Sequence, residues 1–104
     1  MFVPKLSSQA AKVWLVTGCS SGFGRSFVPA ILARGDKVVA TARRISDLDY
    51  IRGDEGARAL QLDITVSEDI IRQKMEQAVG EFGRIDVLVN NAGYVMSGVW
   101  EEVR

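Results

Sequence analysis

The sequence predicts an α/β fold, namely a partial, doubly wound parallel β-sheet with the strand order 3-2-1-4. Short apolar runs bounded by turns alternate with amphipathic helical stretches, and a glycine-rich turn joins the first apolar run to the first of those stretches. Apolar strands that alternate with helices are typical of parallel sheets, and right-handed crossovers place the helices on both faces. In the doubly wound arrangement this succession of elements gives the order 3-2-1-4.

The first strand and the first helix are separated by the glycine-rich turn. Residues 12–17 (KVWLVT) are a short apolar run that ends at a glycine, as expected of a strand buried on both faces. A helix is predicted over residues 23–34, with Gly35 as a left-handed stop and Pro29 as a bend or a limit on its first turns. The residues at helical spacings are Phe23, Phe27, Ala30, Ile31 and Arg34.

The second and third strands enclose a short helix. The second strand is predicted over residues 37–41 (KVVAT) and the third, weaker one over residues 59–62 (ALQL). Between them residues 45–52 are expected to form a short helix, with Ser46 as its N-cap and Gly53 as its stop.

The last predicted elements are a longer helix and a fourth strand. Residues 65–68 (TVSE) fit a capping box, and the helix follows over residues 68–82. The fourth strand occupies residues 85–89 (IDVLV). Residues 1–11 are expected to be an N-terminal extension. The apolar stripe of the longer helix is expected to contain Ile70, Ile71, Met75, Ala78, Val79 and Phe82.

The composition excludes several classes of function. Thirteen basic and thirteen acidic side chains cancel, so no charge excess indicates nucleic acid or an acidic membrane as a partner. The chain has no histidine and a single cysteine, Cys19; a disulfide within the chain and histidine-based metal sites or acid–base catalysis are excluded, and no metal site is assigned. No apolar run is long enough for a membrane helix or a signal peptide. A cytoplasmic location is therefore the expectation.

The turn at residues 17–24 (TGCSSGFG) is the main candidate site, because it leaves a strand and enters a helix. Three glycines suit a tight turn, the approach of a diphosphate and close packing of the helix. Free N–H groups at the start of the helix favour an anion, and the two serines can cap the helix or donate to phosphate. The alternative is a structural turn that only needs glycine. The residues assigned to phosphate binding are Gly18, Ser20, Ser21, Gly22, Phe23 and Gly24.

The end of the second strand indicates which dinucleotide is bound. A carboxylate there selects NAD by accepting hydrogen bonds from the ribose, whereas an arginine accommodates the 2′-phosphate of NADP. The expected acidic position falls at Ala42, followed by Arg43 and Arg44. A guanidinium can bind a phosphate bidentately, so NADP(H) is favoured, with Arg43 as the better candidate. The alternative is a solvated basic turn that pairs with Asp47 or Asp49.

Three motifs together resemble those of the short-chain dehydrogenases/reductases. Residues 17–24 resemble the family's T-G-x-x-x-G-x-G motif, residues 90–93 (NNAG) match its second signature, and Asp63 occupies its acidic position after the third strand. The resemblance covers residues 12–97, the N-terminal part of a typical member. It implies a Rossmann-type fold and an NADP(H)-dependent oxidoreductase of the classical type, which moves hydride between nicotinamide and a small-molecule carbonyl or alcohol. Residues 12–104 are accordingly interpreted as an incomplete NADP(H)-binding domain.

The resemblance also implies roles for residues that follow the third and fourth strands. Asp63 and the Ile64 backbone would contact the adenine ring; the alternative, an Asx turn before the next helix, can hold at the same time. Asn91 would stabilise the sheet. A plain turn rich in asparagine and glycine is the alternative for this segment. The wall of the cofactor site would consist of Asn90, Ala92 and Gly93.

The family's catalytic Tyr-x-x-x-Lys pair has no match in this sequence. Tyr50 is followed four residues later by Asp54, and Tyr94 by Gly98, so no catalytic residue is assigned. A sheet that ended at the fourth strand would leave one flank of residues 86–89 unpaired. The chain alone is therefore expected to be marginally stable, to bind NADP(H) weakly and to show no turnover, whereas the full-length protein is expected to be a homo-oligomer.

Two other functions were weighed. A non-catalytic NADP(H)-binding module or sensor would keep the site without the chemistry. A different enzyme with the same kind of fold, such as a methyltransferase, would be expected to have an acidic residue at the end of the second strand and no NNAG segment, and both expectations fail.

Overall fold

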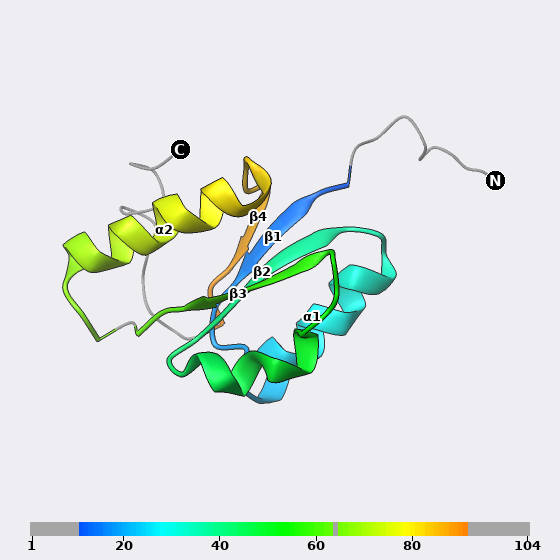
Figure 1. Ribbon diagram of the computed structural model, residues 1–104, viewed down its shortest axis with the longest axis horizontal. Coiled ribbons are helices and arrows are strands. Elements are labelled where there is room, and N and C mark those ends of the chain that lie inside the picture. The colour runs from blue at the N-terminus through cyan, green and yellow to red at the C-terminus, as the bar shows by residue number, and fades with distance from the viewer. Residues whose placement is uncertain (1–10, 64, 92–104) are drawn as a thin grey trace.

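The computed structural model describes residues 11–63 and 65–91 of the chain, which form one parallel sheet covered by helices (Figure 1). The sheet has the order β3-β2-β1-β4, as predicted from the sequence. Its strands are β1 (Val13–Val16), β2 (Lys37–Ala42), β3 (Ala57–Gln61) and β4 (Val87–Val89). The helices in the described ranges are α1 (Gly22–Ala33), the 3₁₀ helix η1 (Ile45–Ile51) and α2 (Glu68–Phe82).

The register brings the carboxyl ends of the strands to one edge of the sheet. Val16 at the end of β1 is paired with Ala40 of β2 and with Val89 of β4. Ala42 at the end of β2 is paired with Gln61 at the end of β3. The glycine turn, the basic pair after β2 and the acidic position after β3 therefore lie along the same edge, where open α/β sheets bind their ligands.

The two faces of the sheet carry separate apolar cores because neighbouring residues of a strand point in opposite directions. Figure 1 shows α2 on one face and α1 with η1 on the other. The core under α2 contains Leu15 and Val39, and the core under α1 and η1 contains their neighbours Val16 and Val38. Such strands, buried on both sides, explain the continuous apolar runs of the sequence.

The first helix buries a different stripe from the one predicted. Phe23 and Phe27 are exposed, at 79% and 37% of their surface, so their placement on the apolar stripe was wrong. The buried residues of α1 are Gly24, Val28 and Ile31. These three share one helical face, and that face is set by the close packing of Gly24, which the apolar pattern does not reveal. The helix continues through Pro29 to Ala33.

The helix caps also differ in part from the prediction. The N-cap of α2 is Ser67, whose hydroxyl accepts a hydrogen bond from the Ile70 N–H at 3.4 Å, and not Thr65. In η1 the N-cap is Arg44 and makes no side-chain cap bond, so Ser46 does not cap this helix. Gly35, predicted to stop α1, has a positive φ of 86°.

The second helix follows its prediction more closely. Its bounds agree with those expected, and Ile71, Met75 and Ala78 are buried. Ile70 is 44% exposed, because it lies in the first turn on the solvent side of the helix. None of the helices in the described ranges is both long and apolar enough to cross a membrane.

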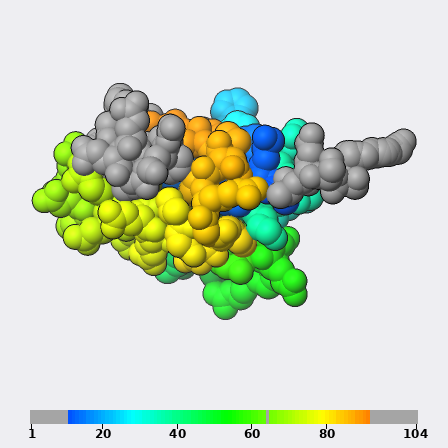
Figure 2. Space-filling model, turned by 90° about the horizontal axis from the view of Figure 1, so that it is seen from above, coloured from blue at the N-terminus to red at the C-terminus, as the bar shows by residue number. Residues whose placement is uncertain are grey.

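The fourth strand lies at an edge of the described sheet. Among the described residues it pairs with β1 on one side, and its three residues are only half-buried. In Figure 2 this orange segment is seen at the surface beside the yellow end of α2. An apolar edge strand with open main-chain groups is a surface for further pairing.

Candidate functional site

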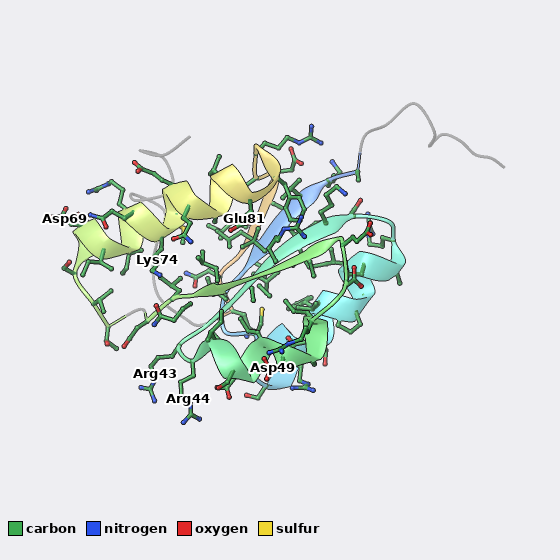
Figure 3. The ribbon with its side chains drawn as sticks, in the orientation of Figure 1. Arg43, Arg44, Asp49, Asp69, Lys74 and Glu81 are labelled. Carbon is green, nitrogen blue, oxygen red and sulfur yellow. The ribbon has the colours of Figure 1, made fainter. Side chains whose placement is uncertain are left out.

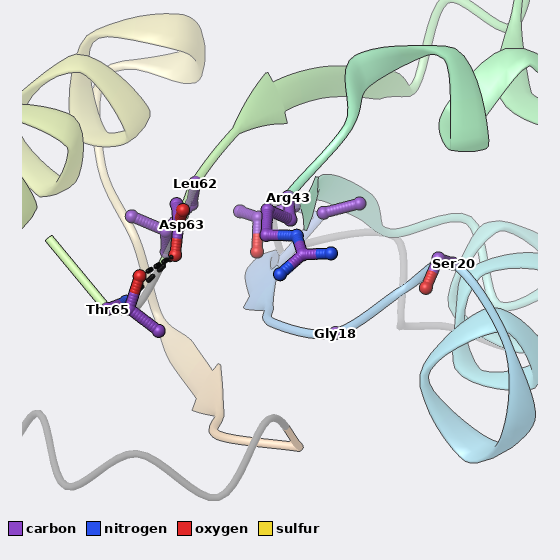
Figure 4. A pocket seen from close by; sticks show the side chains of 8 residues that line it. Gly18, Ser20, Arg43, Leu62, Asp63 and Thr65 are labelled. Carbon is purple, nitrogen blue, oxygen red and sulfur yellow. Dashed lines mark hydrogen bonds between the residues drawn. The ribbon is translucent and has the colours of Figure 1, made fainter.

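A pocket of about 330 Å³ lies at the carboxyl ends of β1, β2 and β3. Figure 4 shows it from close by, with the glycine turn on one side and the segment after β3 on the other. The loops that follow three different strands therefore contribute to one site. The lining residues are Gly18, Ser20, Thr41, Ala42, Arg43, Leu62, Asp63 and Thr65.

The glycine turn has the backbone geometry that requires glycine at two positions. Gly18 and Gly22 have positive φ angles of 68° and 62°, a region that other residues rarely adopt. A Cβ atom on Gly22 would meet no atom of the described protein within 4 Å. The space above Gly22 is therefore open toward the outside of the turn, and its backbone can be approached closely.

Gly24 is needed for packing instead. A Cβ atom there would collide with the carbonyl oxygen of Gly18 and would lie 2.7 Å from Nδ2 of Asn91. The start of α1 thus packs directly against the turn and against the segment after β4. Ser21 is the N-cap residue of α1, but its hydroxyl makes no capping hydrogen bond.

The turn is held to the strands on both sides of β1. The Cys19 N–H donates to the Thr41 carbonyl of β2 at 2.8 Å, and the Thr17 N–H donates to the Val89 carbonyl of β4 at 3.0 Å. The Asn91 side chain donates to the Gly18 carbonyl at 3.1 Å. This last bond joins the NNAG segment to the glycine turn, and the role of Asn91 in stabilising the sheet stays a prediction.

The role of the other NNAG residues as cofactor ligands stays a prediction. Asn90 follows β4 at the carboxyl edge, and its Oδ1 accepts a hydrogen bond from the Thr17 hydroxyl at 3.3 Å. The assigned residues Ala92, Gly93 and Ile64 lie outside the described part of the chain.

Arg43 and Arg44 differ in their surroundings, although both leave the loop after β2 (Figure 3). Arg43 lines the pocket, and Figure 4 shows its guanidinium between Asp63 and Ser20. Arg44 forms an exposed ion pair with Asp47, with Nε and Oδ2 3.5 Å apart. The pairing with Asp47 that was weighed from the sequence is thus present at Arg44, while the roles of Arg43 and Arg44 in binding a cofactor stay predictions.

Asp63 is held in an Asx turn by Thr65. Its Oδ1 accepts hydrogen bonds from the Thr65 hydroxyl at 2.6 Å and from the Thr65 N–H at 2.9 Å. These bonds, with a smaller contribution from the charge of Arg43, hold the pKa of Asp63 below its usual value. Asp63 is thus an oriented carboxylate at neutral pH, and the Asx turn weighed from the sequence is confirmed.

Tyr50 makes a contact with the glycine turn that the sequence does not reveal. Its hydroxyl donates to the Cys19 carbonyl at 2.7 Å, across 31 residues of sequence. The ring lies under the Arg25 guanidinium, whose carbon is 4.0 Å from the ring centroid. No motif marks Tyr50, because the contact depends on how η1 packs on the sheet.

Cys19 is buried, with its thiol 3.2 Å from the Val16 carbonyl. Burial raises the pKa of the Cys19 thiol to about 11, against a smaller lowering by the hydrogen bond with Thr41. The thiol is therefore protonated at neutral pH. The reactive form of cysteine is the thiolate, which is scarce here. Cys19 therefore serves to pack the turn.

We expect the folded chain to react with iodoacetamide at pH 8 at least ~10-fold more slowly than the same chain in urea, because folding removes the thiolate and shields the sulfur. Mass spectrometry of timed samples measures both rates. Equal rates under the two conditions would show that Cys19 is not buried in solution.

The comparisons with known proteins agree with this fold and this site. The family model of the short chain dehydrogenases matches residues 12–104. The oxidoreductase BOA17 of Botryotinia fuckeliana is 37% identical over 95 residues, which cover 88% of this chain and 34% of that protein. The chain spans about a third of the length of the curated relatives it matches.

Solved structures of the same family share the fold. A short-chain dehydrogenase from Streptomyces avermitilis has a TM-score of 0.74 and 48% identity, over 83% of this chain and 32% of that one. A metagenomic short-chain oxidoreductase in complex with NADP has a TM-score of 0.70 and 32% identity, over 80% and 39%. A Brucella melitensis reductase complexed with NADH has a TM-score of 0.67 and 29% identity, over 88% and 42%. On its family match, its strand order and its glycine turn, this chain belongs to the short-chain dehydrogenase/reductase family.

Proposed function

We propose that this chain is the NADP(H)-binding part of an oxidoreductase that moves hydride between the nicotinamide and a small-molecule carbonyl or alcohol. The observation that carries the cofactor choice is the end of β2, where Ala42 and Arg43 line the pocket. Ala42 cannot accept a hydrogen bond from a ribose hydroxyl through its side chain, and Arg43 can donate to a 2′-phosphate.

The glycine turn fits the diphosphate of such a cofactor. The positive φ and open surroundings of Gly22 leave its backbone accessible to a bulky anion. The N–H groups at the start of α1 are directed along the helix axis, and the helix dipole favours negative charge at this end. When bound, the dinucleotide supplies the hydride chemistry, while the turn binds and orients its diphosphate.

The 330 Å³ pocket is the site proposed for the adenosine end of the cofactor. Leu62 lines it and is otherwise buried, and Asp63 offers an ionised carboxylate that Thr65 orients. We propose that Asp63 accepts a hydrogen bond from the adenine amino group. Arg43, on the opposite side of the pocket, is the residue proposed to bind the 2′-phosphate.

The proposal is tested by titrating the ¹⁵N-labelled chain with NADP⁺ and with NAD⁺ while recording amide spectra. The chain is small, at 11.4 kDa, and the spectra detect dissociation constants up to the millimolar range. NADP⁺ is expected to bind more tightly than NAD⁺, because one additional charge-assisted contact is available to it. Tighter binding of NAD⁺ would contradict the role given to Arg43.

A further inference from the structure

The helix η1 reaches the glycine turn through one side chain. Leu48 and Ile51 are buried in the core under α1 and fix η1 against the sheet. Tyr50, between them, is half-buried and donates its hydroxyl hydrogen to the Cys19 carbonyl at 2.7 Å. This hydroxyl therefore comes from an element packed on the sheet, and it meets the main chain of the turn, not a side chain.

The Tyr50 ring is also held by the first turn of α1. The Arg25 guanidinium carbon lies 4.0 Å from the ring centroid, a distance at which the cation is attracted to the face of the ring. Arg25 immediately follows Gly24. Tyr50 thus connects the beginning of the turn, at Cys19, with its end, at the start of α1.

The hydrogen bond to Cys19 fixes the direction of the next amide. In a trans peptide the carbonyl and the N–H of the following residue point in opposite directions, and the described residues contain no cis peptide bond. With the Cys19 carbonyl turned toward Tyr50, the Ser20 N–H is turned away from it. Ser20 lines the 330 Å³ pocket, on the path from the adenosine region to the helix start.

The other side of Cys19 is fixed as well. Its N–H donates to the Thr41 carbonyl at 2.8 Å, so neither peptide group of this residue is free to rotate. A donor on the Cys19 carbonyl also polarises the peptide and strengthens the Ser20 N–H as a donor. Burial raises the pKa of Tyr50, and Cys19 adds a smaller rise. The positive charge of Arg25 lowers it slightly, and the resulting pKa is about 12. The phenol therefore keeps its donor hydrogen at neutral pH.

We propose that Tyr50 is a positioning residue for the cofactor diphosphate: its hydroxyl holds the Cys19–Ser20 peptide so that the Ser20 amide is directed to the bound dinucleotide. This rests on the proposed function of the turn as a dinucleotide site. Because the diphosphate is common to NADP and NAD, Tyr50 affects both cofactors equally, whereas Arg43 distinguishes them.

The test compares Tyr50→Phe with the original chain in amide titrations with three ligands. Phenylalanine keeps the ring under Arg25 and removes only the hydroxyl. Binding of NADP⁺ and NAD⁺ is expected to weaken by about 3- to 10-fold each, as for one lost hydrogen bond. Adenosine 2′-monophosphate has no diphosphate and meets Ser20 only at the edge of the adenosine pocket, so its binding is expected to weaken less than that of either dinucleotide. In the free protein the Ser20 amide signal is expected to shift upfield, because its peptide loses a donor.

Ser46→Ala is the matched control, since it removes a hydroxyl from an exposed position of the same helix. It is expected to change neither the three affinities nor the Ser20 signal. The proposal is overturned if Tyr50→Phe binds both dinucleotides as tightly as the original chain does. It is also overturned if the binding of all three ligands weakens equally, because that would indicate a general structural effect. Failure of the original chain to bind any of the three ligands would instead reject the proposed function itself.

Discussion

Replacing Gly24 by alanine is expected to lower the free energy of unfolding by about 3 kcal/mol, at the upper end for overpacking. The new Cβ would collide with the Gly18 carbonyl oxygen, which belongs to the backbone, and would lie 2.7 Å from Nδ2 of Asn91. Gly18 cannot yield easily, because its φ is 68° and its carbonyl is held by Asn91. The helix start must move away from the turn, so dinucleotide binding is expected to be lost as well. Urea unfolding followed by circular dichroism measures the change.

Gly80→Ala is the matched control for this substitution. Gly80 lies in α2, is exposed, and a Cβ there would meet nothing within 4 Å. Alanine is expected to stabilise this helix by about 0.5–1 kcal/mol, because it restricts the unfolded chain and favours the helix. A Gly24→Ala chain as stable as Gly80→Ala would show that α1 does not pack on the turn.

Replacing Arg43 by alanine is expected to weaken NADP⁺ binding by roughly 10- to 100-fold, as for a lost charge-assisted hydrogen bond of about 1.5–3 kcal/mol. NAD⁺ binding is expected to change by less than about 3-fold, because NAD⁺ carries no 2′-phosphate. The Gln61 side-chain amide donates to the Arg43 carbonyl at 3.0 Å, and this bond does not involve the Arg43 side chain. The fold should therefore be unaffected. Amide titrations with the two cofactors give both dissociation constants.

Arg44→Ala removes the same charge from the neighbouring position. Its guanidinium is paired with Asp47 and is not among the groups that line the pocket, so NADP⁺ binding is expected to weaken by less than about 3-fold, through the long-range loss of one positive charge. Equal losses in the two variants would mean that only the overall charge of this loop matters, and would remove the specific role of Arg43.

The strand order and the place of the site follow from local patterns in the sequence. Short runs such as residues 38–40 are apolar throughout because both faces of the sheet are covered, and this is typical of a parallel sheet. The glycine turn is readable because positive φ angles at Gly18 and Gly22 leave few other residues possible. Once the sheet is parallel, its carboxyl edge brings Arg43 and Asp63 to the same pocket.

Features that depend on packing between distant segments were not readable. Close packing of the helix at a glycine of the turn was expected and is found at Gly24, against Gly18 and Asn91, but the face of α1 that this packing buries was not, and two phenylalanines at helical spacing gave the wrong stripe. The hydrogen bond from Tyr50 to Cys19 requires the position of η1, which no local pattern gives. The N-cap of α2 was predicted two residues too early, because Thr65 and Ser67 are both suitable N-cap residues. In the structure the Thr65 hydroxyl donates to Asp63, and Ser67 caps the helix.

The central claim is that the turn over residues 18–24 binds the diphosphate of a nicotinamide dinucleotide. Its most direct test is the amide spectrum of the labelled chain with saturating NADP⁺, recorded near 15 °C, where domains are usually close to their maximum stability. The largest shifts are expected at Ser20, Gly22 and Gly24, with further shifts at Arg43 and Asp63. A well-dispersed spectrum in which these amides stay in place, or in which shifts gather instead around the separate pocket lined by Pro29, Leu32 and Asp54, would contradict the claim.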